Sequence, residues 1–261
     1  EAMLVELCRC QQRRGGVLDR ESELVKKRLA WIARAKSARP EVVDVSLSEL
    51  EPQGTGELNR HGMPTTPPGQ HLVKNWPVLD LGDHPQIKAA DWQLEICGEV
   101  EEPIVLNFAD LMELPQLEVA ADFHCVTTWS RVDMLWTGVS FSALCELVVP
   151  TAKAAFVLTT GSDREPCSGE AYTTNLSLEK ALSPDVMLVH SADGELLSAE
   201  HGGPVRMITP RLYAWKGSKW IERVEFSADD RPGFWEQRGY SNTAEPWYED
   251  RFSRRGVGED G

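Results

Sequence analysis

The sequence predicts a mixed α+β fold in which short strands predominate. Apolar residues that alternate with polar ones mark a half-buried strand, as at Trp92, Leu94 and Ile96. Segments with helical spacing lie between such strands, and a residue type that favours helix N-termini precedes two of them. The 261 residues are 41% hydrophobic and include 9 tryptophans, so the chain can bury a substantial core.

The predicted elements of the main domain alternate between strand and helix along the chain. Asn107 can cap a helix that ends before Pro115, and Ser140 can cap another helix. Between them, alternating apolar residues over 117–123 predict a strand that delivers Cys125 at its end. Further strands are expected at 154–160, 186–190, 204–209 and 220–226, a helix at 177–182, and a surface-wrapping tail over 229–254.

The N-terminal quarter of the chain has a different character. Residues 19–39 show the apolar spacing of an amphipathic helix that ends before Pro40, and residues 52–85 are rich in Pro and Gly, as in an extended arm. We therefore expect an N-terminal helical appendage and linker, then one domain with an extended arm and a C-terminal wrapping tail, then a flexible tail, at residues 1–60, 61–254 and 255–261.

The charge and hydropathy of the chain argue against nucleic acid as a partner and against a membrane-spanning helix. Lys and Arg number 27 against 41 Asp and Glu, and the resulting net charge of -14 would repel a nucleic-acid backbone. No run of about 18 apolar residues is present, so no membrane-spanning helix is expected. An anionic ligand would need a local cluster of cations in this acidic chain.

The six cysteines do not form a recognisable framework. They are thinly scattered, with no C-x-x-C pair and no four-ligand zinc spacing, which argues against disulfide, zinc, haem and iron–sulfur frameworks. Any metal must use few protein ligands. The sequence shows no export signal, and a cytoplasmic location is expected.

Cys125 is a candidate site residue with two interpretations. In DFHCVTTWS it follows a predicted strand, where a loop could present its thiol to a pocket. It also has the same parity as the apolar residues of that strand, and it could simply continue their buried face. The segment by itself leaves both interpretations open.

The second candidate region is HGGPVRMITPRLYAWKGSKW, at residues 201–220. Arg206 offers a planar fork for an oxyanion, and Lys216 and Lys219 bracket a Gly-Ser turn whose N–H groups could face a phosphate. The alternative is a hairpin with solvated basic side chains. Arg206, Lys216 and Lys219 together with three glycines in one short segment of an acidic chain favour the phosphate cradle.

These motifs in this order resemble a known family. DFHCVTTWS, then W-x-G-V at 136–139, HGGPVR and KGSKW are similar to the molybdopterin-binding domain of sulfite oxidases, plant nitrate reductases and bacterial methionine-sulfoxide reductase catalytic subunits. The resemblance covers roughly residues 70–250. It implies the sulfite-oxidase-type molybdopterin-binding fold and a molybdenum–molybdopterin cofactor.

The resemblance also implies roles for individual residues. Cys125 matches the cysteine that binds molybdenum directly, and a soft thiolate suits a metal that also carries dithiolene sulfurs. The pterin and its phosphate would be lined by Thr160, His201, Arg206, Gly217, Ser218 and Lys219. Candidates for the substrate side are Trp129, Arg131, Asp133 and Tyr172.

The activity that the resemblance implies is oxygen-atom transfer to or from a small oxyanion or sulfoxide. The chain carries no haem domain, so a separate electron-transfer protein is the expected partner. Thr127 stands where the sulfoxide reductases have a glutamate, and the Arg-Asn-His loop of the sulfite oxidases is missing. The substrate therefore stays open.

Two rival functions are considered. One is a non-catalytic molybdopterin-binding or carrier protein, which would bind the cofactor without turnover. The other is a thiol enzyme that uses Cys125 as a nucleophile and needs a nearby base. His124 adjoins Cys125, but neighbours on a strand point to opposite faces, which weakens that alternative.

Overall fold

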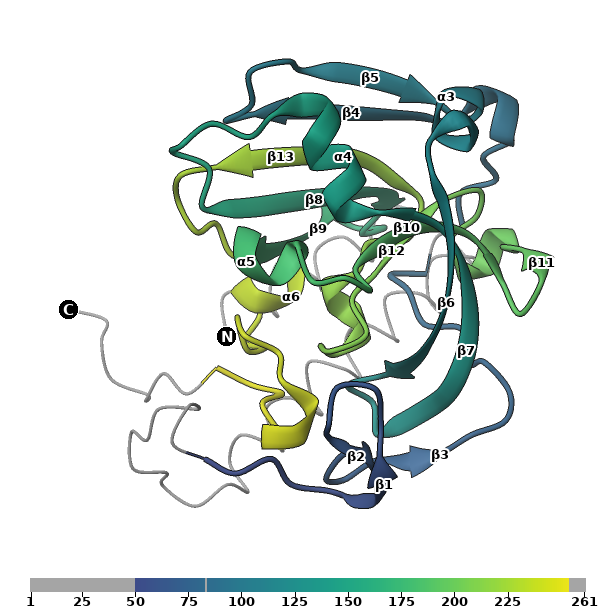
Figure 1. The fold of residues 1–261 in the computed structure, drawn as a ribbon, viewed down its shortest axis with the longest axis vertical. Coiled ribbons are helices and arrows are strands. Elements are labelled where there is room, and N and C mark those ends of the chain that lie inside the picture. The colour runs from purple at the N-terminus through teal and green to yellow at the C-terminus, as the bar shows by residue number, and fades with distance from the viewer. Residues whose placement is uncertain (1–49, 83, 254–261) are drawn as a thin grey trace.

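Two sheets form the centre of the molecule in the computed structural model, which describes residues 50–82 and 84–253 (Figure 1). The five-stranded sheet has the order β5-β4-β13-β8-β9. Its strands are β4 (Gln93–Gly98), β5 (Ile104–Asn107), β8 (Phe156–Arg164), β9 (Ala171–Ser177) and β13 (Ile221–Ser227). Its pairs are antiparallel except for β4 and β13, which run parallel.

The six-stranded sheet is built around the pairing of β7 with β10. It consists of β3 (His71–Leu72), β6 (Gln116–His124), β7 (Trp129–Ser140), β10 (Met187–Ala192), β11 (Glu195–Leu196) and β12 (Arg206–Ile208). A separate small sheet pairs β1 (Thr55–Leu58) with β2 (Pro64–Thr66). Strands therefore predominate, as the sequence predicts.

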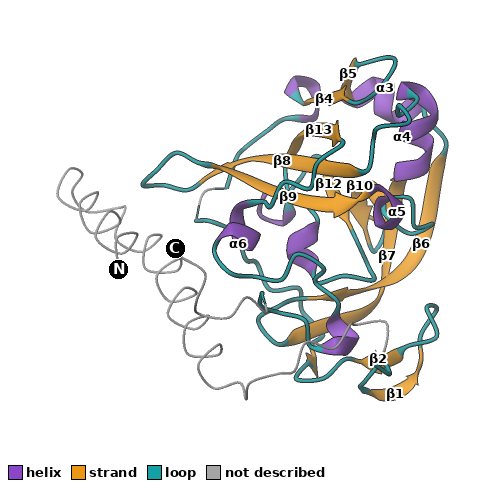
Figure 2. Ribbon diagram, turned by 90° about the vertical axis from the view of Figure 1, so that its left-hand side faces the viewer, coloured by secondary structure: helices purple, strands orange, loops and turns teal. Residues whose placement is uncertain are grey.

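The helices are short and lie at the edges of the strands (Figure 2). The α-helices are α3 (Phe108–Glu113), α4 (Phe141–Val148), α5 (Leu178–Ala181) and α6 (Phe234–Gln237). Single 3₁₀ turns are η2 (Ala89–Asp91), η3 (Ala199–His201), η4 (Ala214–Lys216) and η5 (Pro246–Tyr248). No helix in the described part of the chain is long and apolar enough to cross a bilayer.

The predicted helix caps are confirmed. The Asn107 side chain accepts a hydrogen bond from the Asp110 backbone N–H at 3.1 Å, and the Asp110 carboxylate accepts one from the Asn107 N–H, which forms a capping box. Ser140 accepts from the Ala143 N–H at 3.2 Å at the start of α4. These local bonds satisfy backbone donors that a helix leaves without partners.

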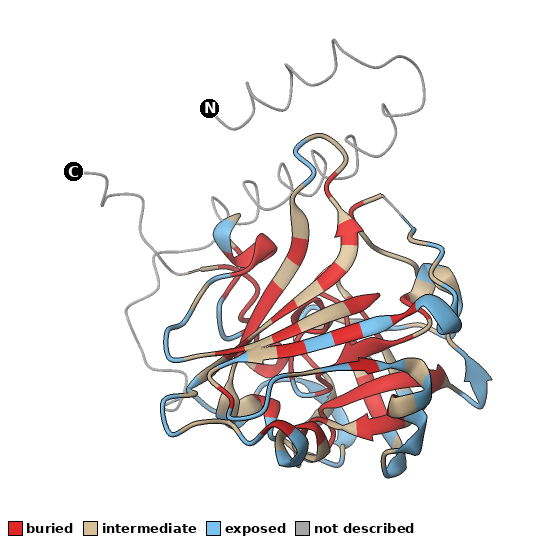
Figure 3. Ribbon diagram, turned by 90° about the horizontal axis from the view of Figure 1, so that it is seen from above, coloured by how far each residue is buried: buried red, intermediate tan, exposed pale blue. Residues whose placement is uncertain are grey.

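Buried residues concentrate on the central strands, and exposed residues lie mostly at their outer edges (Figure 3). The larger apolar core includes Trp92, Phe141 and Val224. A smaller cluster packs around Trp136 and Met187 on the six-stranded sheet. Tyr172 and Trp215 of the larger core, and Trp76 and Phe123 beside the smaller cluster, line the cavity described below.

The segment after β13 differs from the surface-wrapping tail that the sequence suggested. Phe234, Trp235, Tyr240, Trp247 and Phe252 are all at most 4% exposed. The segment also holds the N-terminal arm, because the Trp247 indole N–H donates to the Pro64 carbonyl at 2.6 Å. It is part of the packed domain. The predicted helix at 19–39 and the predicted tail at 255–261 lie outside the described residues.

Candidate functional site

A cavity opens where the ends of several strands meet the N-terminal arm. The arm contributes residues 76–81, and the loop after β6 contributes Cys125 and Thr127. The wall on the other side comes from Arg206 on β12 and from the segment after η4. Elements from four parts of the chain thus converge on one space.

Cys125 follows β6 and lines the cavity although it is only 8% exposed, and its Sγ lies 3.1 Å from Thr127 Oγ1. Its backbone N–H donates to the Trp129 carbonyl at 2.9 Å, and its carbonyl accepts from the Thr128 N–H at 3.2 Å. Phe123, two residues earlier, also borders the cavity. The apolar face of β6 therefore becomes the cavity wall at the end of the strand. Cys125 both continues this buried face and lines the cavity, so each of the two interpretations from the sequence is partly right.

Arg206 is a buried cation beside the thiol. Its guanidinium carbon lies 5.5 Å from the centre of the Trp76 ring and 5.1 Å from that of Phe123, so two aromatic faces flank its charge. Burial lowers its pKa to about 10, while Tyr172 and Cys125 act in the opposite direction. Arg206 therefore stays charged near neutral pH.

Lys219 is the second cation of the wall. Its ammonium donates to the Glu200 carbonyl at 2.7 Å and lies 3.3 Å from the Asp80 carboxylate. Burial is the main reason that its pKa falls to about 8, and Asp80 partly opposes the fall. The proton on Lys219 is thus held less firmly than on an exposed lysine.

His201 completes this side of the cavity. Its ring stacks on Trp76 with centroids 3.9 Å apart, and its Nε2 donates to the Trp76 carbonyl at 3.1 Å. Burial lowers its pKa below the usual range. The arm residue Trp76 is therefore fixed against both His201 and Arg206.

The turn from 216 to 219 alternates between the cavity and the core. Gly217 and Lys219 border the cavity. Lys216 and Ser218 are both fully buried and point the other way, and Ser218 Oγ is hydrogen-bonded to Thr159 Oγ1 at 2.7 Å. A Cβ at position 217 would lie 2.4 Å from the Met207 carbonyl oxygen, so only glycine allows this close approach.

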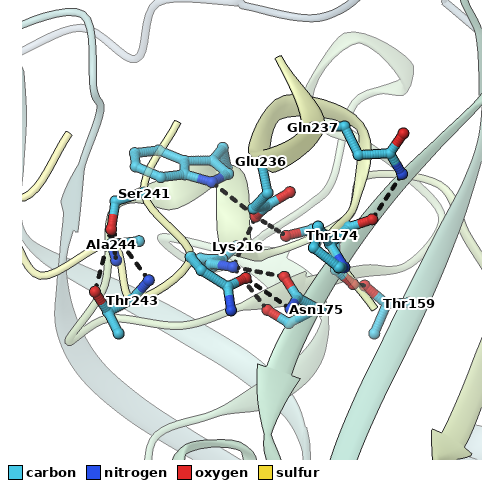
Figure 4. Close-up of polar contacts among 12 residues, drawn as sticks. Thr159, Thr174, Asn175, Lys216, Glu236, Gln237, Ser241, Thr243 and Ala244 are labelled. Atoms are coloured by element: carbon cyan, nitrogen blue, oxygen red, sulfur yellow. Dashed lines mark hydrogen bonds and ion pairs between the residues drawn. The ribbon is translucent and has the colours of Figure 1, made fainter. Parts of the chain in front are cut away.

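Lys216 does not form part of a phosphate cradle, in contrast to the sequence-based expectation. Its ammonium lies 2.7 Å from Glu236 Oε1 and donates to the Asn175 carbonyl and side-chain oxygen at 3.0 and 2.8 Å (Figure 4). Its charge is therefore used inside the core. The three cations that sit together in the sequence are divided between two environments.

The predicted site residues fall into two groups. Cys125, His201, Arg206, Gly217 and Lys219 are brought together at the cavity. Thr160 and Ser218 do not border it. The Thr160 backbone pairs with Thr173 and Arg223 in the sheet, and the adjacent Thr159 is the residue that contacts Ser218.

The four substrate-side candidates divide in the same way. Trp129 and Tyr172 border the cavity. Arg131 instead pairs with Asp193, and the Asp133 backbone N–H donates to Asp122 at 3.1 Å. Neither of these two charged residues is among those lining the cavity.

Asp163 is a cavity residue that the sequence reasoning missed. It is 3% exposed, and its Oδ1 has no hydrogen-bond partner. Burial raises its pKa to about 7, and Lys219 acts against the rise. Val157, Thr159, Gly161 and Asp163 all point inward from β8, so extending the predicted strand by parity would have found it.

His124 gives no support to the thiol-enzyme alternative. Its Nδ1 lies 2.8 Å from Ser130 Oγ, and it packs against Trp247 rather than toward the cavity. Burial lowers its pKa to about 3, so it is a poor proton acceptor near neutral pH.

The arrangement fits a particular kind of ligand. No group of three or more His, Cys, Asp or Glu side chains suited to a metal occurs in the described ranges, so a metal bound at Cys125 would draw its other ligands from outside the protein. Arg206 and Lys219 suit an anionic group, and the Asp163 oxygen suits a hydrogen-bond donor. A metal carried on an anionic organic cofactor meets these requirements.

Comparisons with known proteins agree on one family. The family model described as the oxidoreductase molybdopterin binding domain matches residues 81–235. The uncharacterized oxidoreductase YuiH of Bacillus subtilis is 37% identical over 188 residues, which cover 72% of this chain and 91% of that protein. The protein-methionine-sulfoxide reductase catalytic subunit MsrP of Campylobacter jejuni is 31% identical over 156 residues, 56% of this chain and 52% of that protein.

A solved structure supports the fold. The sulfane dehydrogenase SoxCD from Paracoccus pantotrophus superposes with a TM-score of 0.53 at 22% identity, covering 74% of this chain and 57% of that chain. This chain therefore spans about half the length of the Campylobacter relative and of the Paracoccus chain.

Proposed function

Because this chain belongs to the oxidoreductase family with a molybdopterin-binding domain, we propose that it transfers an oxygen atom to or from a small substrate at a molybdenum held by Cys125. Family membership confirms the resemblance that the motifs predict, and with it the molybdenum–molybdopterin cofactor and an enzymatic role. When bound, that cofactor supplies a two-electron centre for oxygen-atom exchange. The observation that carries the proposal is that Cys125, the buried Arg206 and the partly buried Lys219 line one cavity.

The chain's own residues are proposed to bind and orient the cofactor. Cys125 gives the metal a thiolate. Arg206 and Lys219 neutralise the charge of the phosphate, and Gly217 lines the cavity beside them. His201 fixes the arm over the site through its contacts with Trp76. Thr160 and Ser218 are left out as direct contacts because neither borders the cavity.

Asp163 is proposed as a further contact of the cofactor. Its unpartnered Oδ1 is buried at the cavity wall, where an N–H of an organic ligand would satisfy it. Burial makes the neutral form of the carboxyl accessible near neutral pH, since its pKa rises to about 7. The group can therefore act as donor or acceptor toward the ligand.

The substrate is proposed to be a small sulfoxide or oxyanion. Reduction of a sulfoxide consumes two electrons and two protons and yields a thioether and water. Oxidation of sulfite takes an oxygen atom from water and releases two electrons and two protons. Either reaction requires an electron carrier, and we propose a separate electron-transfer protein. The name of the Campylobacter relative, a catalytic subunit, is consistent with such a division of labour.

A cytoplasmic location is part of the proposal. Cell fractionation with an antibody to the chain tests this part, and recovery in an extracytoplasmic fraction would overturn it.

The test of the proposed function compares the native chain with Cys125→Ala, both expressed in a host that makes the cofactor. We expect stoichiometric molybdenum and pterin in the native chain, and dye-coupled turnover of methionine sulfoxide or sulfite. Cys125→Ala should lose turnover by at least about a thousandfold while it remains folded. Cys145→Ala is the matched control, because this cysteine lies on α4 and does not border the cavity.

Well-folded native chain without molybdenum and pterin would contradict the proposal. So would full turnover in Cys125→Ala, because the metal would then not depend on the thiolate.

A further inference from the structure

A buried ion pair lies behind the wall of the cavity. The side chains of Lys216 and Glu236 are 0% and 2% exposed, and their charged atoms are 2.7 Å apart. Figure 4 shows the Lys216 ammonium between Glu236 and Asn175. Burial of two charges is costly unless each is well paired. We therefore ask which role this charged pair has that two apolar side chains could not have.

One carboxylate oxygen of Glu236, Oε1, contacts three donor groups. Besides Lys216, Glu236 Oε1 accepts a hydrogen bond from the Trp215 indole N–H at 3.0 Å and one from Thr174 Oγ1 at 2.9 Å. Trp215 borders the cavity, whereas Lys216, Thr174 and Glu236 do not. Glu236 thus reaches the cavity only through the indole ring that it holds.

The backbone of Trp215 is fixed from the other side. The Tyr172 hydroxyl donates to the Trp215 carbonyl, and Tyr172 itself borders the cavity. The Trp215 ring also packs against Tyr213 and Tyr240, with centroids 5.3 and 4.8 Å away. The bond to Glu236 adds a directional contact at the indole N–H to this packing.

The fold sets the position of the Glu236 carboxylate. Glu236 lies on α6, and Gly233 caps the start of that helix directly against β9. A Cβ at Gly233 would lie 2.4 Å from the Thr173 carbonyl oxygen, so glycine lets the helix approach the strand. Thr174 on the same strand then binds the carboxylate. The acceptor for Trp215 is therefore built on two rigid elements.

We propose that Glu236, with Lys216 as its counter-ion, is a positioning residue that fixes the Trp215 ring in the wall of the cavity and so shapes the substrate side of the site. The inference rests on the proposed function for its effect on turnover, but the fixed position of Trp215 does not. A ring held at both the indole N–H and the main chain presents a constant aromatic face to the ligand.

The test compares two double variants that both remove the buried charges. Lys216→Met with Glu236→Gln keeps a side-chain oxygen that can accept from Trp215, whereas Lys216→Met with Glu236→Leu does not. Both should fold, because apolar or neutral replacement of a complete buried pair is tolerated. Lys180→Met with Glu245→Leu is the control, since that partly exposed pair lies outside the cavity lining.

The first readout is hydrogen exchange of the Trp215 indole N–H in ¹⁵N-labelled holoenzyme, with the signal assigned from Trp215→Phe. We expect slow exchange in the native chain, the Gln double variant and the control, and exchange at least about tenfold faster in the Leu double variant. The second readout is the split between KM and kcat for methionine sulfoxide and sulfite. KM should rise about tenfold in the Leu variant alone, with kcat and molybdenum content little changed.

Equal exchange and equal KM in the two double variants would overturn the inference, because the pair would then act only in stability. If the native chain binds molybdenum but turns over neither substrate, the proposed function fails. The exchange comparison still decides whether Glu236 positions Trp215.

Discussion

Lys216 and Lys219 lie three residues apart, yet they belong to regions that use a positive charge in opposite ways. Lys216 belongs to a buried layer behind the cavity, which we call the floor and define as Thr174, Asn175, Lys216 and Glu236, none of which borders the cavity. There its charge is fully paired in a place that no ligand reaches. Lys219 belongs to the cavity wall, which we define as Arg206, Gly217 and Lys219. Its charge borders the cavity and is shared with Asp80.

The difference lies in how complete the pairing is. Glu236 and two oxygens of Asn175 surround the Lys216 ammonium. The Lys219 ammonium has two oxygen partners, the Glu200 carbonyl and the Asp80 carboxylate, and that carboxylate also lies 2.7 Å from His84 Nε2. A phosphate could therefore add to the pairing of Lys219, while nothing could be added to that of Lys216. A cation is available for binding only where the fold leaves its pairing incomplete.

The largest effect that would separate the two regions is on stability. Lys216→Met leaves Glu236 charged and buried with no counter-ion, which should lower the free energy of unfolding by about 3–5 kcal/mol. Urea unfolding of the cofactor-free chain measures the change. Lys180→Met is the control, because its partly exposed pair with Glu245 should contribute no more than about 1 kcal/mol. Equal losses in the two variants would erase the distinction between floor and surface.

The sequence was sufficient where a local pattern decides the structure. The caps at Asn107 and Ser140 depend on bonds within three residues, and both were predicted. The placement of Cys125 at a strand end followed from alternation over β6. The predicted family, strand-rich fold and cofactor also agree with the comparisons. They could be predicted because several short motifs follow one another along the chain in the order that is typical of the family.

The sequence was insufficient where the partner is distant. Nothing near Lys216 indicates that its counter-ion is Glu236, which lies in a segment that looked like a surface tail. The long strand β7 was missed because it mixes charged and apolar residues, with consecutive buried and half-buried positions rather than a clean alternation. Asp163 was missed because the predicted strand stopped at residue 160, although β8 continues to Arg164.

A second, smaller effect concerns the wall. Lys219→Met should weaken retention of the cofactor by about ten- to a hundredfold, because a charged hydrogen bond to phosphate contributes about 1.5–3 kcal/mol. Stability of the cofactor-free chain should change little, since the variant removes a cation that burial already disfavours. Pterin content after extended dialysis measures retention. Lys219→Arg is the control that keeps the charge, and equal loss in both variants would show that shape rather than charge matters there.

The smallest effect is on the pH dependence of stability. It concerns Lys219, in the cavity wall. The pKa of Lys219 is about 8 in the folded chain, below its ordinary value of 10.5. The unfolded chain therefore binds more protons between these two values, and the stability of the cofactor-free chain should rise with pH there, by about 1 kcal/mol at pH 9. Below pH 8 the penalty for burying the charged lysine is fully present.

Cofactor retention should follow the opposite sign. As pH rises through about 8, Lys219 loses the proton that attracts the phosphate, so retention should fall while stability rises. Both quantities are measured from pH 7 to pH 9.5, the free energy of unfolding with urea and retention from the pterin content. The difference between the native chain and Lys219→Met at each pH separates the contribution of Lys219 from that of other titrating groups. A charge that binds the phosphate makes cofactor retention and the stability of the cofactor-free chain respond to pH in opposite directions. If both quantities changed with the same sign, Lys219 would instead be a structural cation like Lys216.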